Sequence, residues 1–500
     1  MPAPAPSPAP PPAPTLPPAL PPLAPGSLPV IGHAHRLLGQ RLAFLEELRG
    51  HGDVVAVAAG PLRLHMVNDP ALVRDVLGRR AAEFGTSDQY RLMARITGNG
   101  LLLSEGAFHR RQRRLILPAF NHARVRGYAA VMSALVESWS EGWQEGREIA
   151  AADEFGSLAT EIVVRCLFSQ GIGREDVAEV VHGMPHLMTW VGSRGLDPTG
   201  VLASLPTPVN RRFRRSLDVL HAITRRVIAE RRAGGEEADD LLGMLLGARD
   251  DETGAPMADQ QIHDEVMTFL TAGAETTSRG LAWSVYLLGR HPEALGRLHA
   301  EVDEVLAGRT ATFDDLPGLP YTRRVLTEAL RLYPPGYLLS RGALADTVLG
   351  GHLVPAGATV LLSPYALHRD AGLFADPQRF DPDRWAPERA GDVTPEAYLP
   401  FGLGPHGCLG EGFAWTEMTI ALATLAARWE LRPRSSRPVR PVPAFSLACG
   451  PMPMTPHRRA VAPIAARPLP AARHAGAGAE PGAALPVGRA VRQAEDPPRK

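Results

Sequence analysis

The sequence has little lysine, little cysteine and no excess charge of either sign. Lys500 is the only lysine, and 53 basic and 53 acidic residues balance to a net charge of +0. A neutral chain has no overall positive field, which argues against nucleic acid as a partner. The three cysteines, Cys166, Cys408 and Cys449, are too few and too scattered for a disulfide framework or a zinc site. These shortages favour a protein of the reducing cytoplasm.

Long apolar runs are missing as well. No uninterrupted apolar stretch of about twenty residues occurs, and no basic segment precedes a short apolar one near the N-terminus. We therefore expect neither a membrane anchor nor an export signal. Proline, by contrast, is abundant in residues 1–26, which predict an extended, disordered tail, and residues 463–500 predict a second one. Residues 27–462 are then expected to form one domain.

Between these tails, the spacing of apolar residues predicts more helix than sheet. Alternation at residues 54–57 and 63–67 predicts two early strands, and short extended pieces are expected near Val348–Leu362. Amphipathic spacing predicts helices at Arg124–Trp143, Ser157–Phe168, Arg211–Arg232, Ala258–Gly289 and Glu293–Leu306. The expected fold class is mainly α with small β-sheets.

The most specific pattern surrounds Cys408. The sequence Phe-Gly-Leu-Gly-Pro-His-Gly-Cys-Leu-Gly places four glycines around this cysteine, directly before a predicted helix over Phe413–Arg428. Glycines allow turns in which amide N–H groups approach the sulfur, and a helix N-terminus adds the positive end of its dipole. Both effects favour a thiolate at Cys408. The alternative is a buried structural cysteine in a glycine-rich turn.

This segment resembles the haem-binding signature of the cytochrome P450 family, Phe-x-x-Gly-x-His/Arg-x-Cys-x-Gly, at every fixed position. The resemblance implies that Cys408 is the axial ligand of a haem b iron, and that a thiolate there favours O–O bond cleavage. It also implies that His406 faces a haem propionate, that Phe401 packs beside the sulfur and that Gly402 belongs to the cofactor loop. The haem is expected to lie between this loop with its helix and a long oxygen-activating helix.

A second motif, Phe-Leu-Thr-Ala-Gly-Ala-Glu-Thr-Thr, lies inside the longest predicted helix. Phe269, Ala272, Gly273 and Thr276 fall at i, i+3, i+4 and i+7 and share one face. Ala272 and Gly273 leave room for a flat cofactor and for O2 as co-substrate. Glu275 and Thr276 can deliver protons to the oxygen without flooding the site with water. The motif is similar to the family's Ala/Gly-Gly-x-Asp/Glu-Thr-Thr pattern; the alternative for Thr276 is a bond to its own helix backbone.

Two further sets of residues follow from the same resemblance. Glu328 and Arg331 lie at i and i+3 on a predicted helix, and Arg384 lies in a later Phe-Asp-Pro-Asp-Arg-Trp segment. The family places such residues in a Glu-Arg-Arg network, to which we assign structural work because a planar Arg fork can hold a carboxylate from two sides.

The second set concerns the propionates, whose burial requires cationic or hydrogen-bonding partners. His109 and Arg113 match the family's Trp/His-x-x-x-Arg motif, and Arg341 matches its other propionate arginine. A solvated helical face is the alternative for the arginine-rich stretch around Arg113. Its neighbours Arg110, Arg111 and Arg114 are expected at the surface, as a basic patch for an acidic electron donor.

The resemblance implies a haem-thiolate monooxygenase that inserts one oxygen atom of O2 into a lipophilic small molecule. Apolar segments expected to line the substrate space favour a terpenoid or polyketide-like compound; they are Tyr90–Leu103, Met184–Val201, Pro335–Leu339 and Phe445–Leu447. No flavin, dinucleotide or iron–sulfur motif is present, so electrons are expected from a ferredoxin and its reductase. We expect a monomer.

Three rival functions stay open on sequence alone. The same haem could support peroxide-driven or isomerising chemistry, although such enzymes are expected to lack the acid-alcohol pair. It could instead sense a gas or a redox change. The chain could also be a helical scaffold without any cofactor.

Overall fold

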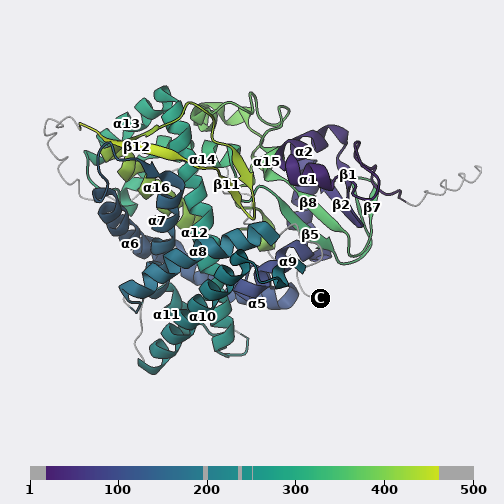
Figure 1. Cartoon of the computed structure of the whole chain (residues 1–500), viewed down its shortest axis with the longest axis horizontal. Coiled ribbons are helices and arrows are strands. Elements are labelled where there is room, and N and C mark those ends of the chain that lie inside the picture. Colours follow the sequence, from purple (N-terminus) through teal and green to yellow (C-terminus); the bar gives the residue numbers. More distant parts are fainter. Residues whose placement is uncertain (1–17, 170, 195–200, 235–238, 251, 461–500) are drawn as a thin grey trace, which may run out of the picture.

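The computed structural model describes residues 18–169, 171–194, 201–234, 239–250 and 252–460. The parts of the two expected tails at residues 1–17 and 461–500 lie outside the described residues. Figure 1 shows a mainly helical body with a small sheet at one end.

Helices make up about half of the described chain. Their bounds are α1 Ala34–Gly39, α2 Arg41–Leu48, α3 Pro70–Arg74, α4 Ala94–Thr97, α5 Gly106–Ile116, α6 His122–Glu141, α7 Ala151–Phe168, α8 Arg174–Arg194, α9 Val201–Ser204, α10 Pro208–Gly234, α11 Leu241–Gly247, α12 Asp259–Arg290, α13 Pro292–Leu306, α14 Pro320–Leu332, α15 Pro364–Leu367 and α16 Glu411–Arg428. Short 3-10 turns used below are η4 Asp88–Met93, η7 Pro382–Trp385 and η10 Gly404–His406. The helices predicted from the sequence are confirmed, with ends that differ by a few residues.

Strands form one five-stranded sheet and three smaller ones. The large sheet has the order β1-β2-β8-β5-β3, with β2 and β8 parallel and the other pairs antiparallel. Its strands are β1 Val54–Ala59, β2 Leu62–Val67, β3 Phe84–Thr86, β5 Leu339–Ala343 and β8 Thr359–Leu362. The small sheets contain β4 Ile149–Ala150, β6 Thr347–Leu349, β7 His352–Val354, β9 Trp429–Pro433, β10 Pro441–Pro443, β11 Leu447–Cys449 and β12 Pro453–Arg458. The two early strands and the extended pieces after residue 347 are therefore confirmed.

Residues 18–26 were expected in the N-terminal tail, but they lie against the large sheet. The Ala24 amide donates to the Ala56 carbonyl at 2.8 Å, and the Ala56 amide donates to the Pro22 carbonyl at 2.8 Å. Pro22 contributes only an acceptor, so its missing N–H does not prevent pairing. The Leu353 amide also donates to the Ala19 carbonyl at 2.9 Å. The structured part of the chain therefore begins before residue 27.

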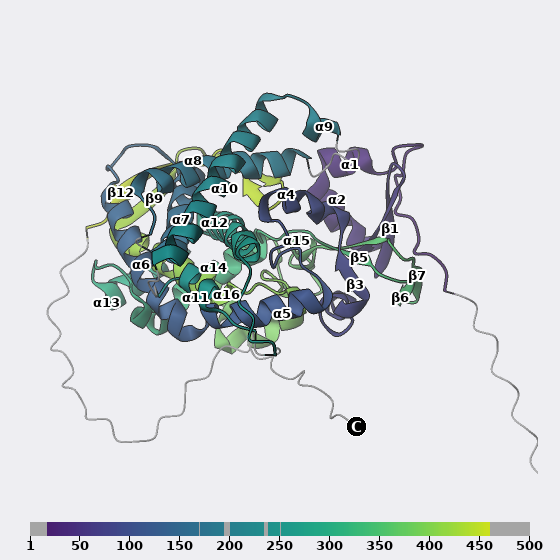
Figure 2. The ribbon, with the colours of Figure 1, turned by 90° about the horizontal axis from the view of Figure 1, so that it is seen from below.

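Helix α12 runs through the middle of the molecule (Figures 1 and 2) and packs against α7, α14 and α16. Its second half is buried almost all round, and Trp283 stacks on Tyr333 with ring centroids 3.7 Å apart. Gly280 lets α16 approach, because a Cβ at this position would lie 2.7 Å from the sulfur of Met418. None of the described helices is long and apolar enough to span a bilayer.

Candidate functional site

The loop before α16 is a tight turn that depends on two glycines. Gly402 and Gly404 have φ of +69° and +72°, a conformation that side chains disfavour, and a Cβ at Gly404 would overlap the carbonyl of Leu77. The Cys408 amide donates to the Phe401 carbonyl at 2.9 Å and closes the turn. The Phe401 ring packs on Trp415 of α16, with centroids 5.3 Å apart. The turn thus presents Cys408 just before the first turn of α16.

The Cys408 thiol does not gain the low pKa that the sequence suggested. Its side chain keeps accessible surface, yet the surrounding protein excludes most bulk water, and this burial raises its pKa to about 11. The Gly410 amide and Arg113 lower the pKa, but they do not outweigh the burial. The glycine-rich turn and the helix dipole alone are therefore insufficient to lower the pKa of the Cys408 thiol. A metal cation bonded to the sulfur would deprotonate it outright.

Helix α12 presents two accessible residues amid buried ones. Ala272 and Thr276, one turn apart, are exposed, whereas Glu275 and Thr277 between and after them are buried. The Thr276 hydroxyl donates to the Ala272 carbonyl at 2.8 Å, which is the backbone bond considered as an alternative. This bond uses the hydroxyl hydrogen, and the Thr276 oxygen can still accept a hydrogen bond from another donor.

The ring of Phe120 connects this face of α12 to the cysteine loop. It meets Phe269 of α12 edge-on with centroids 5.4 Å apart, and it lies beside Gly410. Because Phe269 shares a helix face with Ala272 and Thr276, the exposed face and the cysteine loop border the same region.

Gly273 has a packing role that the sequence did not reveal. A Cβ at this position would lie 2.9 Å from a methyl group of Val163 on α7. The missing side chain at Gly273 therefore allows α12 and α7 to pack closely, and only Ala272 of the small pair presents its side chain to the accessible space.

Glu275 points away from its neighbour Thr276. Its Oε1 accepts a hydrogen bond from the Ser446 hydroxyl at 2.6 Å and lies 3.9 Å from a guanidinium nitrogen of Arg279, while Oε2 has no hydrogen-bond partner among the described residues. Burial raises the pKa of Glu275. No hydrogen bond of the described chain joins Glu275 to Thr276. Sequence reasoning missed Ser446, although it lies in the β10–β11 turn that was expected near the substrate.

Four basic side chains gather next to the cysteine loop. His109 donates from Nε2 to the Pro405 carbonyl at 3.0 Å and stacks on His406, with ring centroids 4.0 Å apart. Arg113 donates to the Gly407 carbonyl at 2.9 Å, and Arg341 on β5 donates to the Ser340 carbonyl at 2.9 Å. All four were expected at the haem propionates, and the structure brings them together.

The charges of this basic cluster are only weakly balanced, since burial lowers the pKa of Arg341 by more than Glu105 raises it. Neither Arg113 nor Arg341 makes an ion pair with any described residue. Burial lowers the pKa of both guanidinium groups, and burial together with neighbouring His109 and the two arginines lowers the pKa of His406 to about 3. Cations held away from water without a counter-charge are costly. The cluster therefore fits an anionic ligand.

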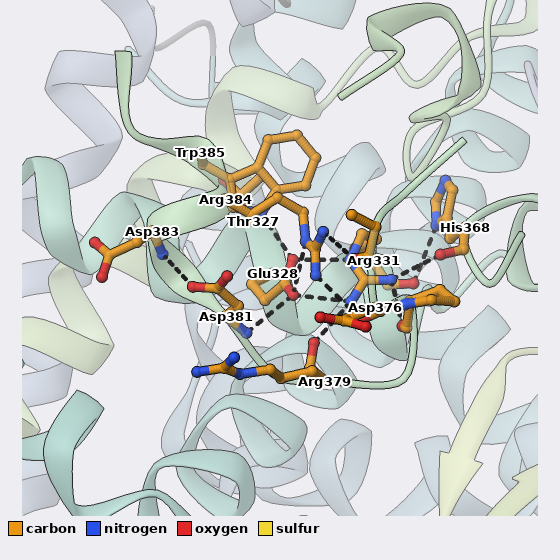
Figure 3. Close-up of polar contacts among 12 residues, drawn as sticks. Thr327, Glu328, Arg331, His368, Asp376, Arg379, Asp381, Asp383, Arg384 and Trp385 are labelled. Carbon is orange, nitrogen blue, oxygen red and sulfur yellow. Dashed lines mark hydrogen bonds and ion pairs between the residues drawn. The ribbon is translucent and has the colours of Figure 1, made fainter. Parts of the chain in front are cut away.

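Glu328, Arg331 and Arg384 form a separate network that Figure 3 shows in close-up. The two Glu328 oxygens each accept from Arg331, at 2.8 Å, and Arg384 reaches the same carboxylate at 3.4 Å. Trp385 donates to Glu328 Oε2 at 2.9 Å, a contact that sequence reasoning did not foresee. The remaining N–H groups of Arg331 donate to carbonyls of His368, Pro377 and Arg379.

The arrangement around Cys408 fits haem b. This group needs an axial ligand for its iron, cations for two propionates and an apolar surface for a flat ring. The structure offers the Cys408 sulfur, the unbalanced Arg113 and Arg341, and the accessible methyl group of Ala272. Among the described residues, no group of three or more His, Cys, Asp or Glu side chains could hold a metal ion by themselves.

Comparison with known proteins agrees with this geometry. The family model described as "Cytochrome P450" matches residues 21–455. Cyclooctatin synthase of Streptomyces melanosporofaciens is 46% identical over 437 residues, covering 87% of this chain and 95% of that protein. Cyclooctat-9-en-7-ol 5-monooxygenase of the same organism is 43% identical and covers 86% of this chain and 94% of that protein.

A solved structure gives the same answer for the fold. The haem domain of cytochrome P450DA superposes with a TM-score of 0.78 at 28% identity, covering 89% of this chain and 98% of that one. The chain therefore belongs to the cytochrome P450 family and is a monooxygenase that uses haem b and dioxygen.

Proposed function

We propose that this enzyme hydroxylates a terpenoid-like lipophilic molecule, with Cys408 as the axial iron ligand and His109, Arg113, Arg341 and His406 at the haem propionates. The observation that carries the assignment is the unbalanced basic cluster directly beside the only cysteine whose side chain is exposed. When bound, the haem iron supplies the binding and activation of dioxygen. The protein's own residues hold that group, shape the substrate space and manage protons.

The ligand assignment has a direct test with two matched controls. Reduced protein treated with carbon monoxide should show the red-shifted Soret band of a thiolate-ligated haem. Cys408→Ser should abolish that shift, whereas Cys166→Ser and Cys449→Ser should keep it, because both cysteines lie away from the basic cluster. A wild-type protein that stays colourless with ample haem, or an unshifted band, would overturn the proposal.

Thr276 and Glu275 are proposed as the acid-alcohol pair that supplies protons. Thr276 supports this role because its hydroxyl oxygen is accessible, and Glu275 because its buried carboxyl has one oxygen without a partner. Thr276→Ala should divert electrons from product to peroxide, because a proton-transfer group typically contributes roughly 10²–10⁴-fold to the rate of its step. Thr271→Ala is the control, since Thr271 is a buried threonine of the same helix that bonds only to backbone carbonyls. Equal coupling in both variants would contradict the role of Thr276.

The substrate proposal rests on apolar segments that meet at one place and on the relatives. Tyr90 of η4 meets Phe445 of the β10–β11 turn edge-on at 6.1 Å, as expected for two substrate-lining segments. A third segment, Met184–Val201, falls partly at residues 195–200, which lie outside the described residues. One similar monooxygenase acts, by its name, on the alcohol cyclooctat-9-en-7-ol. Titration with terpene alcohols should shift the haem spin state, and macrolides should not.

Electrons are proposed to come from a ferredoxin and its reductase. The basic patch expected on α5 is partly neutralised, since Arg111 pairs with Asp250 at 2.8 Å and Arg114 pairs with Glu252 at 3.1 Å. We therefore propose a docking surface with weaker charge steering than the sequence suggested. The rate of reduction by a ferredoxin should fall by less than tenfold between low and moderate salt. A steeper fall would support the basic docking patch expected from the sequence.

A further inference from the structure

Two consecutive carboxylates of α12 hold the loop that follows α4. Asp264 Oδ2 accepts a hydrogen bond from the Asn99 amide at 2.9 Å, and Glu265 Oε2 accepts one from the Leu101 amide at 2.9 Å. Glu265 has no exposed surface and Asp264 is 6% exposed. Burial raises the pKa of Glu265 to about 7, and both bonds lie where little water can compete for the backbone amides. Residues 98–104, called the clamped loop below, are therefore fixed to α12 through their backbone.

The sequence of the clamped loop is fitted to this close approach. Gly98 has a φ of +54°, and a Cβ on it would overlap the Asp264 carboxylate. A Cβ on Gly100 would overlap the hydroxyl of Thr268 and lie 2.7 Å from the Asp264 carbonyl. Only glycine at both positions allows the loop backbone to reach the two carboxylates.

The clamped loop continues into the cofactor site. The Ser104 amide donates to the Gly100 carbonyl at 3.0 Å, and the Ser104 hydroxyl lies 3.1 Å from His109 Nδ1. Because His109 Nε2 donates to Pro405, the serine hydroxyl donates to Nδ1. An unbroken set of polar contacts thus runs from α12 through the clamped loop to the cysteine loop.

The same carboxylates also connect to the helices that cover this region. His263 Nδ1 lies 3.2 Å from Asp264 Oδ1, and His263 Nε2 lies 2.9 Å from Nδ1 of His221 on α10. On the other side of the clamped loop, α4 packs against α12 (Figure 2), and Arg95 of α4 stacks over Trp190 of α8 at 5.5 Å. Helix α10 is therefore joined to Asp264 through His263, and α8 is joined to the helix that precedes the clamped loop.

We propose that Asp264 and Glu265 are positioning residues that clamp residues 98–104 onto α12 and thereby restrict the entry of bulky molecules to the space in front of Thr276. The clamp itself stands on the protein geometry alone, whereas its effect on entry rests on the proposed function. Small ligands pass a fixed loop, but a large apolar ligand requires the loop to move.

The clamp is tested first by amide exchange in the haem-loaded protein. Glu265→Leu removes the acceptor for the Leu101 amide, so exchange in a peptide covering residues 98–104 should become at least tenfold faster. Glu265→Gln keeps a carbonyl oxygen at this place and should restore protection to within twofold of wild type. Asp259→Asn is the control, an exposed acid of the same helix that pairs with Arg232. Unchanged exchange in Glu265→Leu would overturn the clamp.

Entry is tested on the same ferric proteins by the rates at which imidazole and the bulky azole clotrimazole bind the iron. Glu265→Leu should raise the ratio of the clotrimazole rate to the imidazole rate at least fivefold, and Glu265→Gln should leave it within twofold. Faster exchange with an unchanged ratio would overturn the role in entry. Protein without a thiolate-shifted carbon monoxide band would instead refute the proposed function, and the exchange result would still decide the clamp.

A second variant covers the case in which Glu265→Leu does not fold. Gly100→Ala displaces the loop by steric overlap and leaves both carboxylates in place. It should produce the same faster exchange and the same higher ratio. Gly127→Ala in α6 is its control, because a Cβ there meets no atom within 4 Å. A Gly100→Ala protein that behaves like Gly127→Ala would also overturn the proposal.

Discussion

The Glu328 network buries its arginines and the basic cluster beside Cys408 half-buries them, and the two also differ in what surrounds the charge. Arg331 is completely buried, and all of its hydrogen-bonding nitrogens contact a carboxylate or a carbonyl. Arg113 and Arg341 each donate to one carbonyl and make no ion pair with a described residue. The first arrangement pairs its arginines with a shared carboxylate, and the second has no carboxylate within ion-pair distance among the described residues.

This difference distinguishes arginines that stabilise the fold from arginines that bind a ligand, and it does so without any comparison with related proteins. A buried pair that satisfies itself gains nothing from a ligand, and it loses several kcal/mol when one partner is removed. Buried cations without a partner gain from any anion that reaches them. The cluster near Cys408 is therefore built for a ligand, whereas the network around Glu328 holds η7 and the following loop to α14.

Arg331→Ala should give the largest effect. It removes the two short bonds that pair the buried Glu328 with a guanidinium group and leaves the carboxylate only the longer contact with Arg384 and the Trp385 donor, at a cost of about 3–5 kcal/mol. We expect little folded, haem-containing protein, measured as the ratio of Soret to protein absorbance. Arg432→Ala, which removes a surface pair with Glu430 on β9, should cost less than about 1 kcal/mol. Similar losses in both variants would show that the buried network has no special role.

Glu417 of α16 sharpens the comparison, because it is as buried as Glu328 but lacks an arginine. Its Oε1 accepts from Thr277 at 3.0 Å and its Oε2 has no partner among the described residues, and burial raises its pKa to about 8. The unfolded chain releases this proton above pH 4.5, whereas the folded chain retains it until about pH 8. Stability from this group is therefore full below pH 4.5 and is lost as the pH rises to 8.

Glu417→Gln should remove this contribution to the pH dependence of the free energy of unfolding. Between pH 6 and 8 wild type should lose about 2–3 kcal/mol more than the variant, at about 1.4 kcal/mol per pH unit for one proton. Denaturant unfolding at the two pH values measures the difference. Parallel pH profiles for the two proteins would mean that Glu417 is ionised in the folded state.

Arg341→Leu should leave the fold intact and weaken only the ligand. Removing a half-buried cation without an ion pair does not harm the empty chain, but it removes a proposed partner of a haem propionate. Haem loss to excess apomyoglobin should become about 10–100-fold faster, or about 1.4–2.8 kcal/mol. Arg63→Leu, an exposed arginine on β2 of the same sheet, is the matched control. A destabilised fold with normal haem retention would mean that Arg341 stabilises the fold and does not bind haem.

Trp385→Phe should have the smallest effect. It removes one donor to Glu328 Oε2 and keeps the aromatic contact with Tyr398 at 4.7 Å. The carboxylate keeps its bonds to both arginines, so the expected cost is about 1 kcal/mol. A shift of the unfolding midpoint by a few degrees, with haem content unchanged, would agree with this estimate. A loss equal to that of Arg331→Ala would contradict it.

Local sequence patterns predicted most of the fold and the positions of the motifs within it. The helices, the two early strands and the grouping of His109, Arg113, Arg341 and His406 all followed from spacing or from the family resemblance. Ser446, Trp385 and the clamped loop did not, because their partners lie tens to hundreds of residues away in the chain. The glycines at 98 and 100 were the available signal for a close backbone approach, but their partner on α12 could not be named.

The sequence by itself determined which residues belong to the oxygen-activating helix, the cysteine loop and the basic cluster, because those identities depend on short-range spacing or, for Arg341, on the family resemblance. Tertiary structure alone decided that Gly273 serves packing against α7, that Glu275 turns to Ser446 and that residues 18–26 join the sheet. It also decided that the Cys408 thiol has a raised pKa. Burial and long-range contact set these properties, and neither is encoded in the neighbours along the chain.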